Sequence, residues 1–430
     1  MNPRLLISGG RVVTTQGFSQ WPQAGGDFGT LVEHASGFVV IEGEIIRLVT
    51  GNEAEAIQVA GENAEVIDAR GKLVMPGYVD CHTHQAFAGY RDGELGLRLS
   101  GASYLDILAA GGGILSTVRH TREASEEKLC QNTLRVLDIM LAHGTTTVEA
   151  KSGYGLSTVD ELKQLRALQA ANRSHAIDVV PTFMGAHALP PEYSERRADY
   201  VRLVIDEMLP QVAEEKLAEF CDCFCEAKAF TPDESREILQ AAQKLGMGLK
   251  LHADEITPLG GAGLAAELGA VSAEHLIYAA DEDLPKMAQA GVVAVLLPAT
   301  AFILRVPEKA PVQSMIKAGV PIAVSTDYNP GTSPMPNMQL LQAFACYHYG
   351  LTPAQAFAAS TINAAHALKR GASVGSLEAG KLADVIILDA PSLEFVPYHI
   401  GVNLVDIVIK RGRTVYCRPS PACAEEAING

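Results

Sequence analysis

Two histidines, His82 and His84, stand two positions apart at the end of an apolar segment that starts at Leu73. Residues two apart on a β-strand point to the same side, so both imidazoles can bind one metal ion from the end of a single buried strand. A lone pair of this kind also arises by chance. Further ligands at other strand ends must decide between the two interpretations.

Two further apolar segments end in residue types that bind metals. His252 lies at the end of the segment 248–253, and Asp327 follows the segment 320–326. Three imidazoles and one carboxylate suit zinc or ferrous iron, whereas calcium and magnesium prefer oxygen ligands. Each residue alone also fits an ordinary core position, but matching strand ends favour a single metal site. The predicted ligands are His82, His84, His252 and Asp327.

Two more polar residues follow these strand ends. Glu255 lies three residues beyond His252, where it can reach the metal pocket without being a ligand, as a general base for activated water should. His275 falls at the sixth predicted strand end and suits polarising a substrate carbonyl or holding the activated hydroxide. The alternatives are a carboxylate at a helix N-terminus for Glu255 and plain packing for His275.

Arg91, Tyr154 and His187 indicate the substrate side of the site. A guanidinium binds a carboxylate through two hydrogen bonds, so Arg91 predicts a substrate with a carboxylate on a short arm. A surface arginine is the alternative. The turn 329–332 follows the last predicted ligand, and its backbone N–H groups and amide can hold a second or a developing carboxylate.

Strands and helices alternate through the middle of the chain. A helix is predicted over 159–172, and apolar strand patterns begin near residues 76, 145, 177, 220, 248, 271, 292 and 320. Eight parallel strands close a (β/α)8 TIM-like barrel, whose active site lies at the C-terminal strand ends where every candidate ligand falls. A doubly wound open sheet is the alternative, but no G-x-G-x-x-G follows the first strand, and the run 111–113 has the wrong spacing.

Both ends of the chain show strand and turn patterns without intervening helices. We expect residues 1–75 and 376–430 to form one composite small β-sandwich domain beside a barrel of residues 76–375, since chain termini often lie close together. Residues 14–37 are polar, rich in glycine and carry the only tryptophan, which indicates a loop or insertion.

Composition limits the classes of function. The chain has 430 residues, 48% of them hydrophobic, and a net charge of −16, which fits a large soluble enzyme and argues against a nucleic-acid surface. It shows neither a signal peptide nor an apolar run of membrane-spanning length, so a cytoplasmic location is expected. The eight cysteines lack the spacing of a disulfide framework and are expected to be reduced, with 221–225 forming a strand. A homodimer is expected on general grounds.

The chain resembles the amidohydrolase superfamily. The superfamily signature is seen in residues 76–84 and 375–385. Other segments resemble those members that open an imidazolone ring in histidine degradation. These segments are 87–91, 111–118, 151–156, 224–226, 251–255 and 325–332. Together they make the resemblance specific, and it covers nearly the whole chain.

The resemblance implies hydrolysis of the ring amide of 4-imidazolone-5-propanoate to N-formimidoyl-L-glutamate. It implies one zinc or iron ion per chain on the four predicted ligands, with Glu255 and His275 handling protons and charge. Arg91 is expected to bind the propionate. The positions expected to contact substrate or product are Tyr154, His187, Asn329, Gly331 and Thr332.

Three alternatives stay open. Many amidohydrolases bridge two metals through a carboxylated lysine, but Lys151 falls in the segment 151–156 that the resemblance assigns to substrate binding, which favours a mononuclear site. A deaminase or a dihydropyrimidinase-like amidase would share the ligands but not Arg91, Tyr154 and His187. A non-catalytic barrel would have lost a ligand or the general base, and all are intact.

Overall fold

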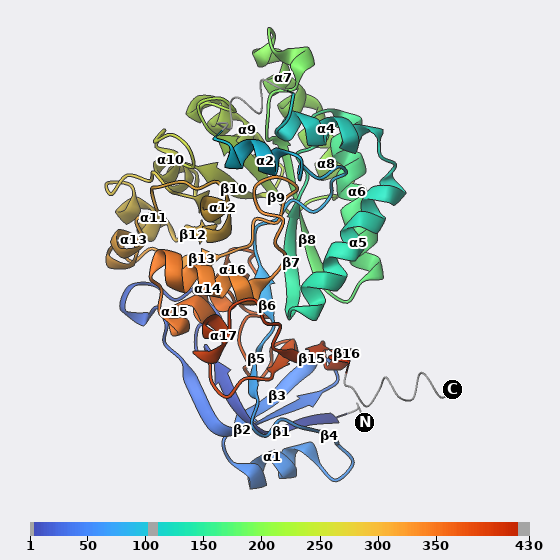
Figure 1. The fold of residues 1–430 in the computed structure, drawn as a ribbon, viewed down its shortest axis with the longest axis vertical. Coiled ribbons are helices and arrows are strands. Elements are labelled where there is room, and N and C mark those ends of the chain that lie inside the picture. Colours follow the sequence, from blue (N-terminus) through green and yellow to red (C-terminus); the bar gives the residue numbers. More distant parts are fainter. Residues whose placement is uncertain (1–3, 102–110, 420–430) are drawn as a thin grey trace.

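The computed structural model describes residues 4–101 and 111–419, whose strands form two sheets (Figure 1). One sheet holds eight strands in chain order, and each neighbouring pair runs parallel. They are β6 (Tyr78–Asp80), β7 (Thr145–Lys151), β8 (Asp178–Ala186), β9 (Phe220–Cys225), β10 (Gly248–Ala253), β11 (Ser272–His275), β12 (Val293–Leu296) and β13 (Ile322–Val324). The eight predicted barrel strands are confirmed.

Side chains close the seam between the first and last barrel strands. Among the described residues no strand ladder joins β6 to β13, but Thr83 forms a parallel bridge with Tyr328. The Asp80 carboxylate accepts hydrogen bonds from Thr326 N (3.0 Å), from Thr326 Oγ1 (2.6 Å) and from the Ser325 hydroxyl. The residues that follow β6 and β13 therefore lie next to one another.

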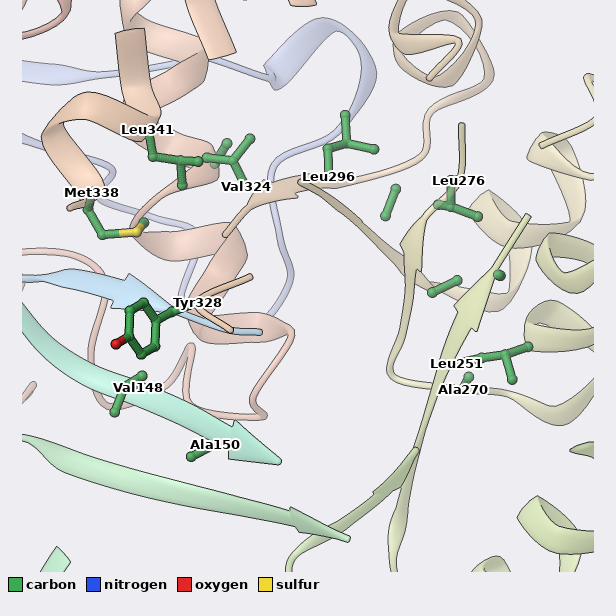
Figure 2. Packing of buried hydrophobic residues seen from close by; sticks show 14 of the residues in the cluster. Val148, Ala150, Leu251, Ala270, Leu276, Leu296, Val324, Tyr328, Met338 and Leu341 are labelled. Carbon is green, nitrogen blue, oxygen red and sulfur yellow. The ribbon is translucent and has the colours of Figure 1, made fainter. Parts of the chain in front are cut away.

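Side chains alternate along the barrel strands between the interior and the surrounding helices. On β7, Val148 and Ala150 belong to the outer hydrophobic core, whereas Glu149 and Lys151 contact each other in the interior. Figure 2 shows part of this outer core, including Val148, Ala150, Leu251, Leu296, Val324, Met338 and Leu341. Because charged residues occupy the inward positions, the barrel interior near the strand ends is polar.

Helices pack around the barrel and cover its apolar outer side (Figure 1). The helices described between residues 94 and 398 are α2 (Glu94–Leu99), α4 (Ile114–Glu123), α5 (Glu126–Ala142), α6 (Thr158–Ser174), α7 (Arg197–Leu203), α8 (Leu209–Glu214), α9 (Pro232–Lys244), α10 (Gly261–Leu268), α11 (Leu284–Ala290), α12 (Pro298–Ile303), α13 (Val312–Ala318), α14 (Met338–Tyr349), α15 (Pro353–Ala359), α16 (Ile362–His366) and α17 (Phe395–Tyr398). Helix α6 contains the predicted 159–172. Within the described ranges, no helix is both long and apolar enough to span a membrane.

Local sequence explains where these helices start. Helix α9 begins with a capping box, in which the Thr231 hydroxyl accepts from Glu234 N and the Glu234 carboxylate accepts from Thr231 N. Pro232 occupies the first turn, where its missing N–H costs nothing. Short turns complete the helical elements: η1 (Gly25–Asp27), η2 (Pro191–Tyr193) and the π-helical η3 (Val204–Met208).

The second sheet combines both ends of the chain, as predicted. From the N-terminal side come β1 (Arg4–Thr14), β2 (Val32–Glu42), β3 (Ile45–Thr50), β4 (Glu65–Asp68) and β5 (Leu73–Pro76). From the C-terminal side come β14 (Val385–Leu388), β15 (Val405–Lys410) and β16 (Arg413–Cys417). Strand β5 pairs parallel with β1 and antiparallel with β14, which joins the two groups into one mixed sheet. Helix α1 (Glu53–Ala60) packs on β2. The outermost residues of the predicted composite domain, 1–3 and 420–430, lie outside the described ranges.

The segment 14–37 is only partly the loop that was expected, because β1 runs to Thr14 and β2 already begins at Val32. Its central part packs at the N-terminal end of the last barrel strand. Gln23 N donates to Asn363 Oδ1 (2.8 Å), and Asn363 Nδ2 donates to Ile322 O (2.8 Å) at the start of β13. This part therefore lies at the end of the barrel opposite the candidate ligands.

Candidate active site and metal centre

Four histidines and one aspartate meet at the C-terminal ends of the barrel strands. The His82 ring lies 5.3 Å from the His84 ring, 4.5 Å from that of His252 and 5.7 Å from that of His275, measured between centroids. Potential ligand atoms of His82, His84 and Asp327 lie within 4.8 Å of one another, and so do those of His82, His252 and His275. The structure therefore joins all four predicted ligands and His275 in one buried cluster.

The atoms of this cluster fit a bound metal ion. His82 Nε2 is buried and has no hydrogen-bond partner among the described residues, and it lies 3.4 Å from Asp327 Oδ1. His84 Nε2 lies 3.6 Å from the same oxygen. The Thr300 hydroxyl donates to Asp327 Oδ2 (2.7 Å), which leaves Oδ1 facing the imidazoles. Converging imidazole nitrogens around a carboxylate oxygen form the donor set that zinc or iron prefers.

Two buried carboxylates hold the histidines from behind. Glu274 Oε2 contacts His82 Nδ1, and Asp222 Oδ2 lies 3.0 Å from His252 Nδ1. A carboxylate at Nδ1 keeps a proton on that nitrogen and leaves Nε2 free to bind a metal. Neither carboxylate was identified from the sequence.

Glu255 lies beside this cluster, with its Oε2 atom 3.5 Å from His275 Nε2. Burial, the Asp327 carboxylate and the Glu226 carboxylate raise the pKa of Glu255 to about 8, so the residue can carry a proton near neutral pH. Burial lowers the pKa of His275 to about 3, which keeps this imidazole neutral. Such a pair can hold and donate protons next to a reacting carbonyl.

The backbone on both sides of Glu255 is held by other carboxylates. Glu226 accepts from Ile256 N (2.9 Å) and Thr257 N (3.2 Å). Asp254 accepts four backbone hydrogen bonds at the start of α10, from Leu259, Gly260, Gly261 and Ala262. The carboxylate at this helix N-terminus is therefore Asp254, which removes the alternative interpretation of Glu255 and leaves its side chain free for the site.

Three residues at these strand ends adopt left-handed backbone conformations. The φ angle is 69° at His275 and 50° at both Asp254 and Asp327. Such a conformation costs a residue with a Cβ about 1–3 kcal/mol and persists only where its surroundings hold it. Strain of this kind gathers at functional sites, and here it turns the chain sharply where the ligands must face inward.

Arg91 presents a buried cation with free donors. Its side chain is 4% exposed, and neither Nε nor Nη1 has a hydrogen-bond partner in the described part of the chain. Glu94 Oε2 lies 3.8 Å from Nε, beyond hydrogen-bond distance. A buried guanidinium with unpartnered N–H groups favours a carboxylate ligand that arrives from outside the protein.

Tyr154 and His187 lie next to the metal ligands. The His187 ring stacks on His84 at 5.1 Å and 20°, and the Tyr154 ring lies 5.2 Å from His187. His187 Nδ1 donates to Gly153 O (2.9 Å), and burial lowers the pKa of His187 to about 3. The other ring nitrogen, Nε2, is therefore an acceptor for a substrate N–H or O–H.

Hydrogen bonds of Asn329 hold the turn 329–332. Asn329 Oδ1 accepts from Gly331 N (2.9 Å), from Thr332 N (2.7 Å) and from the Thr332 hydroxyl (3.0 Å), while Asn329 Nδ2 donates to Asp327 O (2.7 Å). In this structure these N–H groups are engaged inside the turn. The amide of Asn329 braces the turn that follows Asp327.

Comparison with known proteins agrees with this geometry. The amidohydrolase family model matches residues 73–415. The chain is 51% identical over 405 residues to the imidazolonepropionase of Alkaliphilus metalliredigens (strain QYMF), with 94% of this chain and 96% of that protein covered. It is also 51% identical over 412 residues to the imidazolonepropionase of Symbiobacterium thermophilum, with 96% of each covered. The chain belongs to the imidazolonepropionase branch of the amidohydrolase family.

Solved structures show the same fold at lower identity. Guanine deaminase from E. coli superposes on this chain with a TM-score of 0.73 at 16% identity, over 97% of this chain and 100% of the deaminase chain. An adenosine deaminase from Xanthomonas campestris, solved with bound zinc, matches with a TM-score of 0.68 at 20% identity, over 99% and 97% of the two chains. At these identities the likeness concerns the fold.

Lys151 lies in the barrel interior among three carboxylates. Its Nζ atom is fully buried and lies 2.6 Å from Glu149, 2.8 Å from Asp222 and 3.2 Å from Glu274. Although burial alone would lower it, these carboxylates raise the pKa of Lys151 well above its ordinary value. Carboxylation of a lysine requires the neutral amine, so the structure disfavours a carboxylated Lys151 that bridges two metals.

The residues that sequence reasoning missed share one signal. Asp80, Asp222, Lys250 and Glu274 are charged residues inside otherwise apolar strands, and each is fully buried or nearly so. Lys250 stands two positions before a ligand on the same strand face, and Asp80 likewise precedes His82. A charged residue in an otherwise apolar strand therefore marks the inward face of this barrel.

Proposed function

We propose that this chain is an imidazolonepropionase, a metal-dependent hydrolase that converts 4-imidazolone-5-propanoate to N-formimidoyl-L-glutamate. The observation that carries the proposal is a buried metal-binding cluster combined with the Nε and Nη1 donors of Arg91, which have no hydrogen-bond partner among the described residues. The cluster supports hydrolysis of a C–N bond, and the guanidinium supports a small substrate with a carboxylate arm. Relatives about half identical over nearly the whole chain carry that name.

The proposed metal ligands are His82, His84, His252 and Asp327, which hold one zinc or iron ion. A metal ion bound there supplies Lewis acidity and activates water near neutral pH. The protonated Lys151 supports a single ion, because no carboxylated lysine is then present to bridge a second one.

Glu255 and His275 are the proposed catalytic residues. Glu255 takes the proton that water loses as its oxygen bonds to the ring carbonyl carbon, and it returns that proton to the ring nitrogen when the C–N bond breaks. His275, neutral because its pKa lies at about 3, donates an N–H to the ring carbonyl oxygen. The second proton of water stays on the new carboxyl group and passes to solvent as the carboxylate forms. The C–N bond that breaks is thus replaced by one C–O bond and one N–H bond, at the cost of one water.

The remaining proposed residues bind and orient the substrate. Arg91 binds the propionate through Nε and Nη1, whose donors are free. His187 accepts a ring N–H at Nε2, and Tyr154 packs beside it. Asn329, Gly331 and Thr332 contact the substrate or product, and the hydrogen bonds between them fix the turn that carries them.

A coupled assay tests the proposal. Urocanate is converted enzymatically to 4-imidazolone-5-propanoate, the purified protein of known metal content is added, and ultraviolet loss is followed together with N-formimidoyl-L-glutamate formation. We expect rapid conversion that a chelator stops, with about one metal ion per chain. A fully metallated protein that converts nothing would contradict the substrate and point to another cyclic amide or amidine.

A further inference from the structure

Beneath the metal-binding cluster, four barrel strands place five charged side chains in the barrel interior. Their relative exposure is 0% in each case. They are Glu149 and Lys151 of β7, Asp222 of β9, Lys250 of β10 and Glu274 of β11. Buried charges on this scale are costly unless they are paired, so their arrangement calls for a specific reason.

Lys151 is the centre of this group. Its ammonium contacts all three carboxylates, of Glu149, Asp222 and Glu274, at 2.6–3.2 Å. Lys250 is more peripheral, since its Nζ lies 3.3 Å from Glu274 and 4.0 Å from Glu149. Of the two lysines, Lys151 is the one that joins the β9 carboxylate to the β11 carboxylate.

The same oxygen atoms that contact Lys151 also contact two metal ligands. Asp222 Oδ2 lies 2.8 Å from Lys151 Nζ and 3.0 Å from His252 Nδ1. Glu274 Oε2 lies 3.2 Å from Lys151 Nζ and contacts His82 Nδ1. One ammonium thus links two histidines that belong to different parts of the barrel, β10 and the end of β6.

We propose that Lys151 is a positioning residue for the metal centre: it fixes the carboxylates of Asp222 and Glu274 so that His82 and His252 present Nε2 to one ion. Without the ammonium, two like charges in the same interior repel each other and the carboxylates turn away from the imidazoles. The inference rests on the metal site of the proposed function and is independent of the substrate.

The overall charge of the group fits this role. It holds one more negative than positive charge, which favours a cation bound directly above it. If stability alone were served, well-packed apolar residues would do as well in a barrel interior. We therefore assign the ionic arrangement to orientation of the metal ligands, since the imidazoles of His82 and His252 must both point at one ion.

Metal affinity separates a positioning role from a structural one. Lys151→Met keeps the side-chain length and removes the charge. Lys250→Met is the matched control, because Lys250 contacts Glu274 through Oε1, the oxygen that does not face His82, and does not contact Asp222. Zinc affinity of the purified full chain is measured by competition with a chromophoric chelator, and the cobalt-substituted protein is compared by visible spectrum. We expect Lys151→Met to bind zinc 10- to 100-fold more weakly with an altered cobalt spectrum, and Lys250→Met to stay within about threefold.

Each outcome decides the inference. Equal zinc affinity of wild type and Lys151→Met overturns it, and so does an equal loss in Lys250→Met. If Lys151→Met does not fold, the double variant Glu149→Gln/Lys151→Met is used, because it returns the net charge of the group to that of the wild type. Asp222 and Glu274 still lack the Lys151 ammonium in this variant, so the same loss of zinc affinity is expected. Wild type that binds zinc but converts no imidazolone contradicts the proposed substrate and leaves this test valid.

Discussion

The absence of a side chain at Gly331 leaves room for the guanidinium of Arg91, so a larger residue at position 331 should displace it. A Cβ at position 331 would lie under 3.0 Å from the Arg91 atoms Nη2, Cζ and Nε, whereas ordinary contact begins at 3.4 Å. The backbone of Gly331 lies outside the left-handed region, so Gly331→Ala introduces no backbone strain. The guanidinium is the far end of a flexible side chain and moves away. We therefore expect little loss of stability but a displaced carboxylate-binding group.

The loss of activity in Gly331→Ala follows from the hydrogen bonds between Arg91 and the substrate propionate that the displacement weakens. A hydrogen bond keeps its strength only over N···O distances of about 2.7–3.2 Å. Nη2 would lie 1.5 Å from the new Cβ and must move to 3.4 Å, a shift several times the width of that range. One hydrogen bond between charged partners contributes about 1.5–3 kcal/mol, which corresponds to about 10- to 150-fold in kcat/KM. Because the propionate is bound equally in the ground state and the transition state, the loss should fall mainly on KM.

A double-mutant cycle tests this reasoning with steady-state kinetics on 4-imidazolone-5-propanoate. The proteins compared are wild type, Gly331→Ala, Arg91→Ala and the double variant. In the Arg91→Ala background, Gly331→Ala should cost less than about twofold, because the group it displaces is already gone. Gly93→Ala is the matched control, since a Cβ at that position meets nothing within 4 Å. The reasoning is refuted if Gly331→Ala keeps a normal KM, or if its cost is unchanged without Arg91.

Three further predictions concern the base, its support and a distant lysine. Glu255→Gln should lower kcat by at least about 10²-fold and leave metal content unchanged, since it removes the proton carrier and not a ligand; near-normal kcat would make the assignment wrong. Glu226→Gln should lower kcat about tenfold at unchanged KM and metal content, because Glu226 holds the backbone of Ile256 and Thr257 beside the base; an altered metal content would contradict this role. Burial lowers the pKa of Lys381 to about 8, so the unfolded state binds more protons between pH 8 and 10.5 and stability should rise with pH in that window by up to about 3 kcal/mol. Thermal melts of Lys381→Met should lack this rise relative to wild type, and parallel pH profiles of the two proteins would contradict it.

Much of this protein was determined by local sequence. The eight barrel strands follow from short apolar segments spaced by helices, and each of the predicted starts lies within a few residues of an observed strand. His82 and His84 share a strand end, so their common direction follows from the period of two. His252 and Asp327 could be added because the strand ends of a parallel barrel face one side. Family membership was likewise readable from contiguous motifs.

What the sequence left undecided concerns contacts between strands. Asp222 and Glu274 reach His252 and His82 only because neighbouring strands take a particular register, which no single segment encodes. The same register places Lys151 among carboxylates.

Loops show the same limit. The tertiary structure alone decided that the amide of Asn329 is used inside its own turn and that Arg91 keeps free donors. It also decided that the segment around Gln23 lies at the far end of the barrel. Residue type and period are local properties of the chain, whereas the partner of a buried charge depends on which distant segments pack around it, and that is settled only when the barrel closes.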